Sequence, residues 1–307
     1  MTSLQHNIGE SLNRDYVALM ASGSFAIFTA LKALAFPAGS DIIMPAICCP
    51  AVLSAIQLAG HNAVIADVDA DSYSMEAANV QAVFTSNCKA VIAVHAYGRP
   101  CNMAALSQVC KDKGMALIED ACLAYGNHCS DGPVGSFGDI SLISFGYDKP
   151  IHCGDGGAIM TNDVKLYDEI NTMITANPML DISATAYDFV QEKWGELEGY
   201  VNIRKDNTDK YLEAISLPWI KTPKAKLGYW RLPLLVNSNR DDLVHSAAKA
   251  GIIITTHYRS LSGLSSHSNT PIAEHIDRSI INAFIRPGTT SQEINSMVNF
   301  LNGYNNG

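Results

Sequence analysis

One lysine of the chain stands where an amine could react with a carbonyl group. Lys149 follows an apolar, β-branched run at Ile140–Phe145, and a second such run, Ala158–Thr161, comes after a glycine-rich turn, so Lys149 is predicted to lie on a loop between two strands. Pro150 stiffens the chain after the lysine, and the turn from Gly154 onward is permissive. A partly desolvated amine held there can attack a carbonyl. A lone loop lysine is usually only solvated, so its neighbours decide the assignment.

An acid and a small-residue turn stand upstream of this lysine. The apolar run Ala116–Ile118 ends in Glu119-Asp120, and the carboxyl ends of strands are where α/β sheets bind ligands. Ser22-Gly23-Ser24 lies between a strand-like run and a helical pattern, so backbone amides and the helix dipole there could hold a phosphate. Hydroxyls such as Ser24 and Ser144 should supplement the weak dipole. A lysine, an acid that keeps a pyridine nitrogen protonated, and a phosphate turn are what pyridoxal phosphate requires.

In order and spacing, these pieces resemble the DegT-type family of pyridoxal-phosphate-dependent sugar aminotransferases, which have the aspartate aminotransferase fold (fold type I). The family pattern is a Ser-Gly-Thr turn, a Pro-Ala pair, Glu-Asp-Ala, Ser-Phe with the lysine four residues after the Phe, and Gly-Glu-Gly-Gly. The corresponding residues here are Ser22-Gly23-Ser24, Pro45-Ala46, Glu119-Asp120-Ala121, Ser144-Phe145 with Lys149, and Gly154-Asp155-Gly156-Gly157. The likeness continues through Val94–Gly98 and Arg286-Pro287, so it covers nearly the whole chain.

The resemblance implies roles for the matching residues. The catalytic residues would be Lys149, which binds the cofactor as a Schiff base and moves a proton as a free amine, and Asp120, which pairs with the pyridine nitrogen. No metal is expected. The implied cofactor-binding residues are Gly23, Ser24, Phe25, Cys49, Asp120, Leu123, Ser144 and Lys149.

The resemblance also implies substrates and partners. It predicts an aminotransferase that takes an amino group from glutamate and gives it to a keto-sugar, nucleotide-linked in the family, in nucleotide-sugar, cell-surface polysaccharide or secondary-metabolite biosynthesis. A homodimer is expected. In relatives, segments near the N-terminus and around the position of Met179 wall the nucleotide-sugar pocket. Because the stretch before Ser22 is short, we expect a smaller or differently carried keto substrate, or weak binding of nucleotide-sugars.

Five positions depart from the family pattern. Cys49 stands where relatives carry the aromatic residue that stacks on the pyridine ring, Leu123 where they carry a Gln beside the phenolic oxygen, and Tyr125 where they carry His. Met179 and Asp181 take the places of an Asn from the partner subunit and a nearby Arg. These losses leave open a non-catalytic or regulatory homologue. A dehydratase or lyase on the same fold is a further alternative, although the family's sugar dehydratases carry histidine at the lysine position.

Composition excludes other classes of protein. The net charge of −9, with no basic stripe, argues against a nucleic-acid partner. No apolar run reaches the roughly 18 residues of a membrane span, and the N-terminus lacks a signal-peptide core, so we expect no membrane partner and a cytoplasmic location. The eight cysteines form no CxxC pair and are expected to be free thiols. A zinc site of Cys122, His128 and Cys129 matches no common spacing, and no GxGxxG follows the first strand, which disfavours a nicotinamide-dependent enzyme.

Strands and helices alternate along the first half of the chain, which predicts an α/β fold with a large, mainly parallel wound sheet. The predicted strands are Tyr16–Met20, Ile42–Met44, Val64–Val68, Ala90–His95, Ala116–Asp120, Ile140–Phe145 and Ala158–Thr161, and the helices between them are Phe25–Leu34, Pro50–Leu58, Met75–Phe84 and Asn102–Lys113. A helical stretch, Asp163–Glu213, then leads to a small C-terminal α/β domain. Its predicted elements are a strand at Tyr229–Val236, a helix at Asp241–Ala250, a strand at Ile252–Thr256 and a closing helix from Ser291. We expect a cofactor-binding domain over residues 1–215 and a small domain over 216–307.

Four more polar residues lie at strand ends. His95 could lie near the cofactor or be a satisfied core histidine, and the sequence leaves both open. His257 and Tyr258 could face the substrate, but surface packing is the better explanation. Arg99 could bind a carboxylate through its planar guanidinium, although nothing in the sequence places it in the site.

Overall fold

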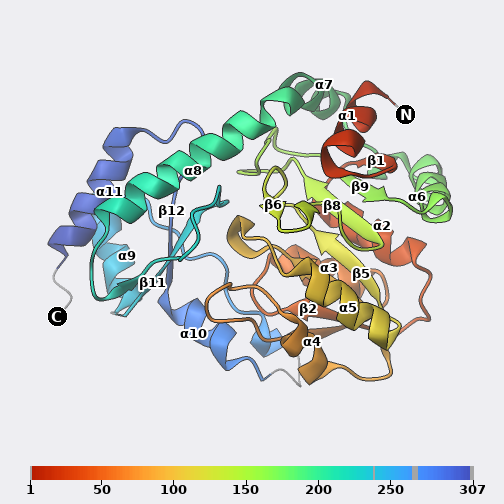
Figure 1. Ribbon diagram of the computed structural model, residues 1–307, viewed down its shortest axis with the longest axis horizontal. Helices are drawn as coiled ribbons and strands as arrows, with labels where there is room; N and C mark the ends of the chain where they lie inside the picture. Colours follow the sequence, from red (N-terminus) through yellow and green to blue (C-terminus); the bar gives the residue numbers. More distant parts are fainter. Residues whose placement is uncertain (1, 238, 265–268, 305–307) are drawn as a thin grey trace.

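The computed structural model describes residues 2–237, 239–264 and 269–304 (Figure 1). Its largest element is a seven-stranded sheet with the order β1-β9-β8-β5-β4-β2-β3. The central strands are apolar and buried on both faces, as in β8, because helices cover both sides of a parallel sheet. The strands are β1 (Tyr16–Met20), β2 (Asp41–Pro45), β3 (Asn62–Ala66), β4 (Cys88–Val94), β5 (Ala116–Asp120), β8 (Ile140–Ser144) and β9 (Gly157–Thr161).

The direction of the strands decides which loops meet. Strand β9 pairs antiparallel with β1 and β8, whereas β2 with β3, β2 with β4, β4 with β5 and β5 with β8 are parallel. The prediction of a mainly parallel sheet is therefore confirmed. Since β1, β2, β5 and β8 run in one direction, the loops that follow them lie at the same edge of the sheet. The connecting helices are α2 (Gly23–Ala33), α3 (Pro50–Leu58), α4 (Ala77–Val83) and α5 (Met103–Lys113).

A second, antiparallel sheet follows in the C-terminal part of the chain. It consists of β10 (Ile220–Lys221), β11 (Leu232–Val236) and β12 (Ile280–Ala283). The predicted strand at Ile252–Thr256 is wrong: Ile253 is 72% exposed, and this segment contributes only an isolated bridge between Thr255 and Asn282. Strand β12, which the sequence analysis missed, pairs with β11 instead. Three helices accompany this sheet: α9 (Arg240–Lys249), α10 (Pro271–Ser279) and α11 (Ser291–Gly303).

Helix α8 (Leu197–Ala214) links the two sheets. Figure 1 shows it running from α7 (Ala184–Lys193) near the larger sheet to α11 beside the smaller one. One apolar core contains residues of both sheets, such as Ile118 and Leu234, and the domain boundary between residues 215 and 216 stays a prediction. Across the described ranges, no helix is long and apolar enough to cross a membrane. The remaining helices are α1 (Ser3–Leu12) and α6 (Val164–Ala176), and a short hairpin is formed by β6 (His128–Cys129) and β7 (Gly132–Pro133).

Candidate active site

The turns that follow β1, β5 and β8 pack tightly against one another. A Cβ atom added to Gly23 would lie 2.9 Å from the Ser144 Cβ and 3.1 Å from the Cys122 Sγ, so a side chain at this position would clash. The Gly156 amide donates to the Ala21 carbonyl at 2.8 Å, which fixes the glycine-rich turn before β9 against the end of β1. The structure therefore brings the predicted phosphate turn, the end of β5 and the end of β8 together.

The N-terminus of α2 is open to a ligand. The Ser22 hydroxyl caps the helix by accepting from the Phe25 amide at 3.2 Å, while Ser24 and Phe25 are exposed. The first amides of a helix have no intrahelical acceptor, so they are available to an anion. Ser144 is buried beside this turn, and its hydroxyl accepts from the Gly146 amide at 3.2 Å. Its own proton is thus free to be donated.

Asp120 ends β5 as a buried carboxylate that is only partly used. It is 6% exposed, and its Oδ1 accepts from the Cys122 amide at 3.0 Å. Throughout the described part of the chain, no hydrogen bond or ion pair reaches its Oδ2. A carboxylate with one free oxygen at the edge of the sheet can pair with a cationic N–H of a ligand.

The neighbouring acid, Glu119, has a structural role. Its Oε1 lies 2.9 Å from the His95 Nε2 and accepts from the Gly135 amide at 2.8 Å, and its Oε2 accepts from the Phe137 amide at 2.7 Å. His95 is fully buried, and its Nδ1 accepts from the Cys101 amide at 2.9 Å. Of the two interpretations left open by the sequence, the satisfied core histidine is therefore the one found.

Lys149 lies on the loop between β8 and β9, as predicted. It is half-buried, and no hydrogen bond or ion pair engages its Nζ among the residues that the structure describes. Burial raises the pKa of the Cys122 thiol well above its usual value, and the charge of Asp120 adds to this, whereas the charge of Lys149 lowers it. Both charged groups thus lie within electrostatic range of one thiol, which brings the predicted lysine and acid into one site.

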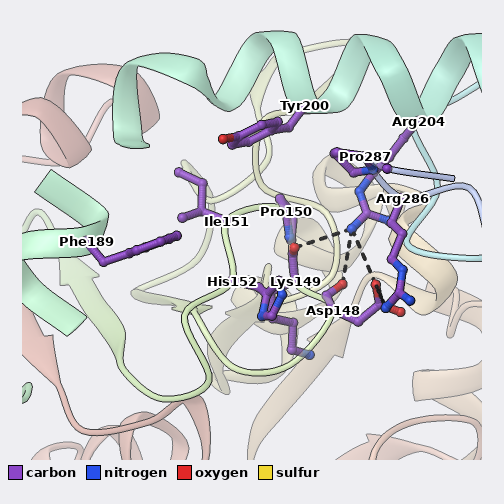
Figure 2. A pocket seen from close by; sticks show the side chains of 11 residues that line it. Asp148, Lys149, Pro150, Ile151, His152, Phe189, Tyr200, Arg204, Arg286 and Pro287 are labelled. Atoms are coloured by element: carbon purple, nitrogen blue, oxygen red, sulfur yellow. Dashed lines mark hydrogen bonds and ion pairs between the residues drawn. The ribbon is translucent and has the colours of Figure 1, made fainter. Parts of the chain in front are cut away.

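Two buried side chains fix the Lys149 loop. The Tyr125 hydroxyl lies within donating distance of two carbonyl oxygens, that of Ser144 at 3.1 Å and that of Ile151 at 2.9 Å. The same hydroxyl accepts a hydrogen bond from the Ile151 amide at 2.9 Å. Arg204 of α8 donates to the carbonyls of Asp148 at 3.2 Å and of Lys149 at 3.3 Å. Figure 2 shows Arg204 reaching this loop from α8. The backbone on both sides of the lysine is therefore held by hydrogen bonds.

A cavity of about 530 Å³ lies between this loop, α7, α8 and the segment after β12. Lys149, Arg204 and Arg286 contribute to its lining (Figure 2). The buried carboxylate of Asp148 accepts from the Arg231 Nε at 2.9 Å, and it lies 3.8 Å from Arg204 and 4.0 Å from Arg286. Three guanidinium groups thus surround one acid directly before Lys149.

Tyr258 covers the site from the C-terminal part of the chain. Its ring stacks on Trp230 at 5.3 Å between centroids, and its amide donates to the Tyr97 hydroxyl at 3.1 Å. The Leu261 amide donates to the Ala46 carbonyl at 2.9 Å, which holds this segment over the loop after β2. Burial raises the pKa of the Tyr258 hydroxyl well above its usual value. Tyr258 therefore has the packing role that was expected, but it is buried against Trp230 and Tyr97 and not at the surface.

Other predicted positions contribute less. Leu123 is buried in the apolar core, so it offers no polar contact, and Cys49 is exposed at the start of α3. Arg99 donates to the Asp71 carbonyl and lines a different cavity. Met179 is exposed, and all eight cysteines are free. Over the described ranges, no group of three or more His, Cys, Asp or Glu side chains could hold a metal ion.

The sequence model of the DegT/DnrJ/EryC1/StrS aminotransferase family matches residues 1–208. The chain belongs to this family. The predicted family and its aminotransferase class are confirmed. The fold is confirmed by solved structures: an aminotransferase of this family from Brucella abortus superposes with a TM-score of 0.91 at 22% identity, covering 98% of this chain and 88% of that one. The aminotransferase from Psychrobacter cryohalolentis superposes with a TM-score of 0.89 at 21% identity, covering 98% and 89%.

Curated members of the DegT/DnrJ/EryC1/StrS family align over different lengths. GDP-perosamine synthase of Escherichia coli O157:H7 is 33% identical over 164 residues, which are 53% of this chain and 45% of that enzyme. The chain therefore aligns with less than half the length of this relative. UDP-N-acetyl-3-dehydro-alpha-D-glucosamine 3-aminotransferase of Acidithiobacillus ferrooxidans is 28% identical over 297 residues, which are 89% of this chain and 80% of that enzyme.

Sequence reasoning missed the residues that support the site. Arg204, Arg231 and Arg286 converge on Asp148. The sequence marked Arg286 only as part of the family likeness, without a role, and it did not mark Arg204 or Arg231. Tyr125 was noticed only as a departure from the family pattern, without a role. Arginine is almost never fully buried unless it is paired, but the burial of Arg204 becomes visible only in the folded chain.

Proposed function

We propose that the protein is a pyridoxal-phosphate-dependent aminotransferase that moves an amino group from glutamate to a keto-sugar. One observation carries this proposal: the turns after β1, β5 and β8 pack against one another at Gly23, so the exposed N-terminus of α2, the buried carboxylate of Asp120 and the half-buried Lys149 loop share one edge of the sheet. Membership of the aminotransferase family supports it. The names of the curated relatives, a perosamine synthase and an amino-sugar aminotransferase, support a sugar acceptor.

The residues at the edge of the sheet fit the cofactor. The exposed N-terminus of α2, with Ser24 and the buried Ser144 beside it, suits the phosphate. The free oxygen of Asp120 suits the pyridinium N–H, and the Lys149 amine suits the aldehyde. The close contact at Gly23 leaves the phosphate turn without a side chain that would fill this space. When bound, pyridoxal phosphate supplies an electron-withdrawing ring that stabilises negative charge on the carbon next to the amino group.

Side chains of the protein would transfer the proton, pair with the ring nitrogen and position the lysine. Lys149 Nζ would move the proton from the α-carbon of the amino donor to the former aldehyde carbon of the cofactor, and in the opposite direction in the second half-reaction. Asp120 would hold its carboxylate opposite the ring nitrogen, where a cationic N–H and a carboxylate form a charge-assisted hydrogen bond. Tyr125 and Arg204 hold the loop so that the amine reaches the reacting atom in the same geometry in each turnover.

The family resemblance supports a homodimer, and eight free cysteines support a reducing compartment such as the cytoplasm. The homodimer and the cytoplasmic location are part of this proposal. We also propose that Phe25, Cys49 and Leu123 contact the cofactor, and that Cys49 stacks less well on the ring than the aromatic residue of relatives. The proposed boundary between the two domains lies between residues 215 and 216.

A spectroscopic titration tests the proposed function. The protein is loaded with pyridoxal phosphate, and visible spectra are recorded after glutamate and then after keto-sugars with and without a linked nucleotide. The proposal predicts loss of the visible band with glutamate, release of one 2-oxoglutarate per site, and return of the band with the keto-sugar. A band that no amino donor changes would instead favour the non-catalytic homologue, and a sugar product without nitrogen would favour a dehydratase.

A further inference from the structure

The cavity beside Lys149 has a charge opposite to that of the chain. The protein carries a formal net charge of −9, yet the charged residues that line the cavity are three cations, Lys149, Arg204 and Arg286, and one acid, Asp148. One oxygen of the Asp148 carboxylate, Oδ2, accepts from the Arg231 Nε outside the cavity at 2.9 Å, whereas its Oδ1 has no hydrogen-bond partner among the described residues. Positive charge in a partly enclosed space with low-dielectric walls concentrates anions.

Arg286 is the lining guanidinium with free donors. Its side chain is 42% exposed, its Nη1 donates to the Tyr147 hydroxyl at 3.0 Å, and its guanidinium lies 5.1 Å from the centroid of the Phe284 ring. These contacts fix the direction of the group but use only one of its five N–H donors. The hydrogen bond with Tyr147 is the largest of the effects that raise the pKa of Arg286, and the charge of Asp148 raises it further, although burial opposes both. The group therefore stays charged.

The remaining arginine in the lining is a support. Arg204 is 2% exposed, and its Nη1 and Nη2 donate to the carbonyls of Trp230, Asp148 and Lys149. Its Nε is buried without a hydrogen-bond partner among the described residues, so it is not presented to the cavity. One further acid, Glu293, lies within electrostatic range of Arg286. However, the Glu293 carboxylate accepts from the Thr290 amide at 2.7 Å in the cap of α11. The Asp148 Oδ1 lies 4.0 Å from the Arg286 Nη1, which is beyond hydrogen-bond distance, so neither nearby acid accepts a hydrogen bond from Arg286.

We infer that this cavity binds the anionic group of a substrate, a carboxylate or a phosphate, through the guanidinium of Arg286. The planar fork of arginine matches both groups with two parallel hydrogen bonds. The inference deepens the proposed function: the carboxylate would belong to the amino donor and the phosphate to the sugar acceptor. The volume of the cavity, about 530 Å³, is in the range of small-molecule binding sites.

Calorimetric titration with two simple anions tests the inference. Glutarate stands for the carboxylate source and pyrophosphate for the phosphate source, and neither carries an amine that could react with the cofactor. Each is titrated into the protein loaded with pyridoxal phosphate, as wild type, Arg286→Met and Arg286→Lys. Methionine keeps the length and packing of the stem but removes the charge. We expect at least tenfold weaker binding of one probe to Arg286→Met, and an intermediate loss in Arg286→Lys, which lacks the fork.

Arg278→Met is the matched control, because Arg278 is exposed on α10 and its loss changes the net charge equally. Weakening of glutarate binding alone would assign the carboxylate, and weakening of pyrophosphate binding alone the phosphate. The inference is overturned if the wild type binds neither probe, or if Arg278→Met weakens binding as much as Arg286→Met. If the protein does not take up pyridoxal phosphate, the proposed function fails, but the same titration of the unloaded protein still tests the cavity.

Discussion

The Tyr125 hydroxyl binds both backbone groups of Ile151, two residues beyond the candidate catalytic lysine. It accepts from the Ile151 amide and lies 2.9 Å from the Ile151 carbonyl oxygen. The ring stacks on Trp194 at 6.1 Å with an interplanar angle of 6°, so the hydroxyl cannot follow the loop if the loop moves. The position of Lys149 therefore depends on a side chain that has no chemical part in the reaction.

Tyr125→Phe should keep the ring packing and remove this support. The Ile151 amide would be left buried and unsatisfied, so we expect the free energy of unfolding to fall by about 1–3 kcal/mol. Loosening of the lysine should lower kcat by on the order of 10- to 100-fold, with a smaller effect on KM. Denaturant unfolding and steady-state kinetics measure both. Tyr229→Phe is the control, since its hydroxyl makes one hydrogen bond, to the Ala225 carbonyl. Equal kcat values in the two variants would contradict a positioning role for Tyr125.

Asp120→Asn and Glu119→Gln should show that one of these adjacent acids serves catalysis and the other serves stability. Asp120→Asn should unfold near the wild-type temperature but lose turnover, because an amide cannot stabilise a pyridinium, and each pKa unit lost there corresponds to about 1.4 kcal/mol. Glu119→Gln should lower stability by about 1–3 kcal/mol, because the new amide would face the N–H donors of Gly135 or Phe137. Thermal unfolding and single-turnover rates check this. Unchanged turnover in Asp120→Asn would rule out the proposed pairing.

The sequence predicted those parts of the fold that local patterns encode. Buried parallel strands read as continuous apolar runs, so the strand ends that carry Asp120 and Lys149 could be placed. Helix α1 was missed because its three buried apolar residues, Leu4, Ile8 and Leu12, lie in a mostly polar stretch. Strand β12 has only four residues, and its apolar character does not distinguish it from a helix end.

The supporting contacts of the site could not be predicted from local patterns. Tyr125 and Ile151 are 26 residues apart in sequence, and Arg231 and Asp148 are 83 apart. Such pairs form only after the helices and both sheets have packed, and no local periodicity encodes them. The resemblance to the family supplied Lys149 and Asp120, but the arginine cluster around Asp148 forms only in the folded chain.

Cys49→Phe should strengthen cofactor binding if this position faces the ring. Cys49 is exposed at the start of α3, so a larger side chain there does not overpack the core. Aromatic stacking contributes about 0.5–1.5 kcal/mol, which predicts a Kd for pyridoxal phosphate about two- to twelvefold lower. Fluorescence titration measures it. Leu58→Phe, at the exposed far end of the same helix, should change nothing. Weaker or equal binding in Cys49→Phe would place Cys49 outside the ring's contact.

His257 should make stability depend on pH. Burial, and then the charge of Arg231, lowers its pKa, and Arg231 Nη1 lies 2.9 Å from its Nδ1, which accepts when the ring is neutral. Since the folded pKa lies below the value of about 6.5 in the unfolded chain, this stability is fully present above about pH 6.5 and is lost as pH falls through the folded pKa. His257→Asn keeps an acceptor but does not titrate. The melting temperature is measured at about pH 7.5 and at about pH 5.5. The decrease between the two pH values should be smaller in His257→Asn than in the wild type, and equal decreases would contradict the account.

The most direct test of the central claim is to locate the lysine that bonds to pyridoxal phosphate. The loaded protein is reduced with borohydride, digested and analysed by mass spectrometry, alongside Lys149→Ala and Lys165→Ala, whose lysine is exposed at the start of α6. The account predicts a reduced pyridoxyl group on Lys149 in the wild type and in Lys165→Ala, and no visible band or label in Lys149→Ala. A visible band that persists in Lys149→Ala, with the label on another lysine, would contradict it.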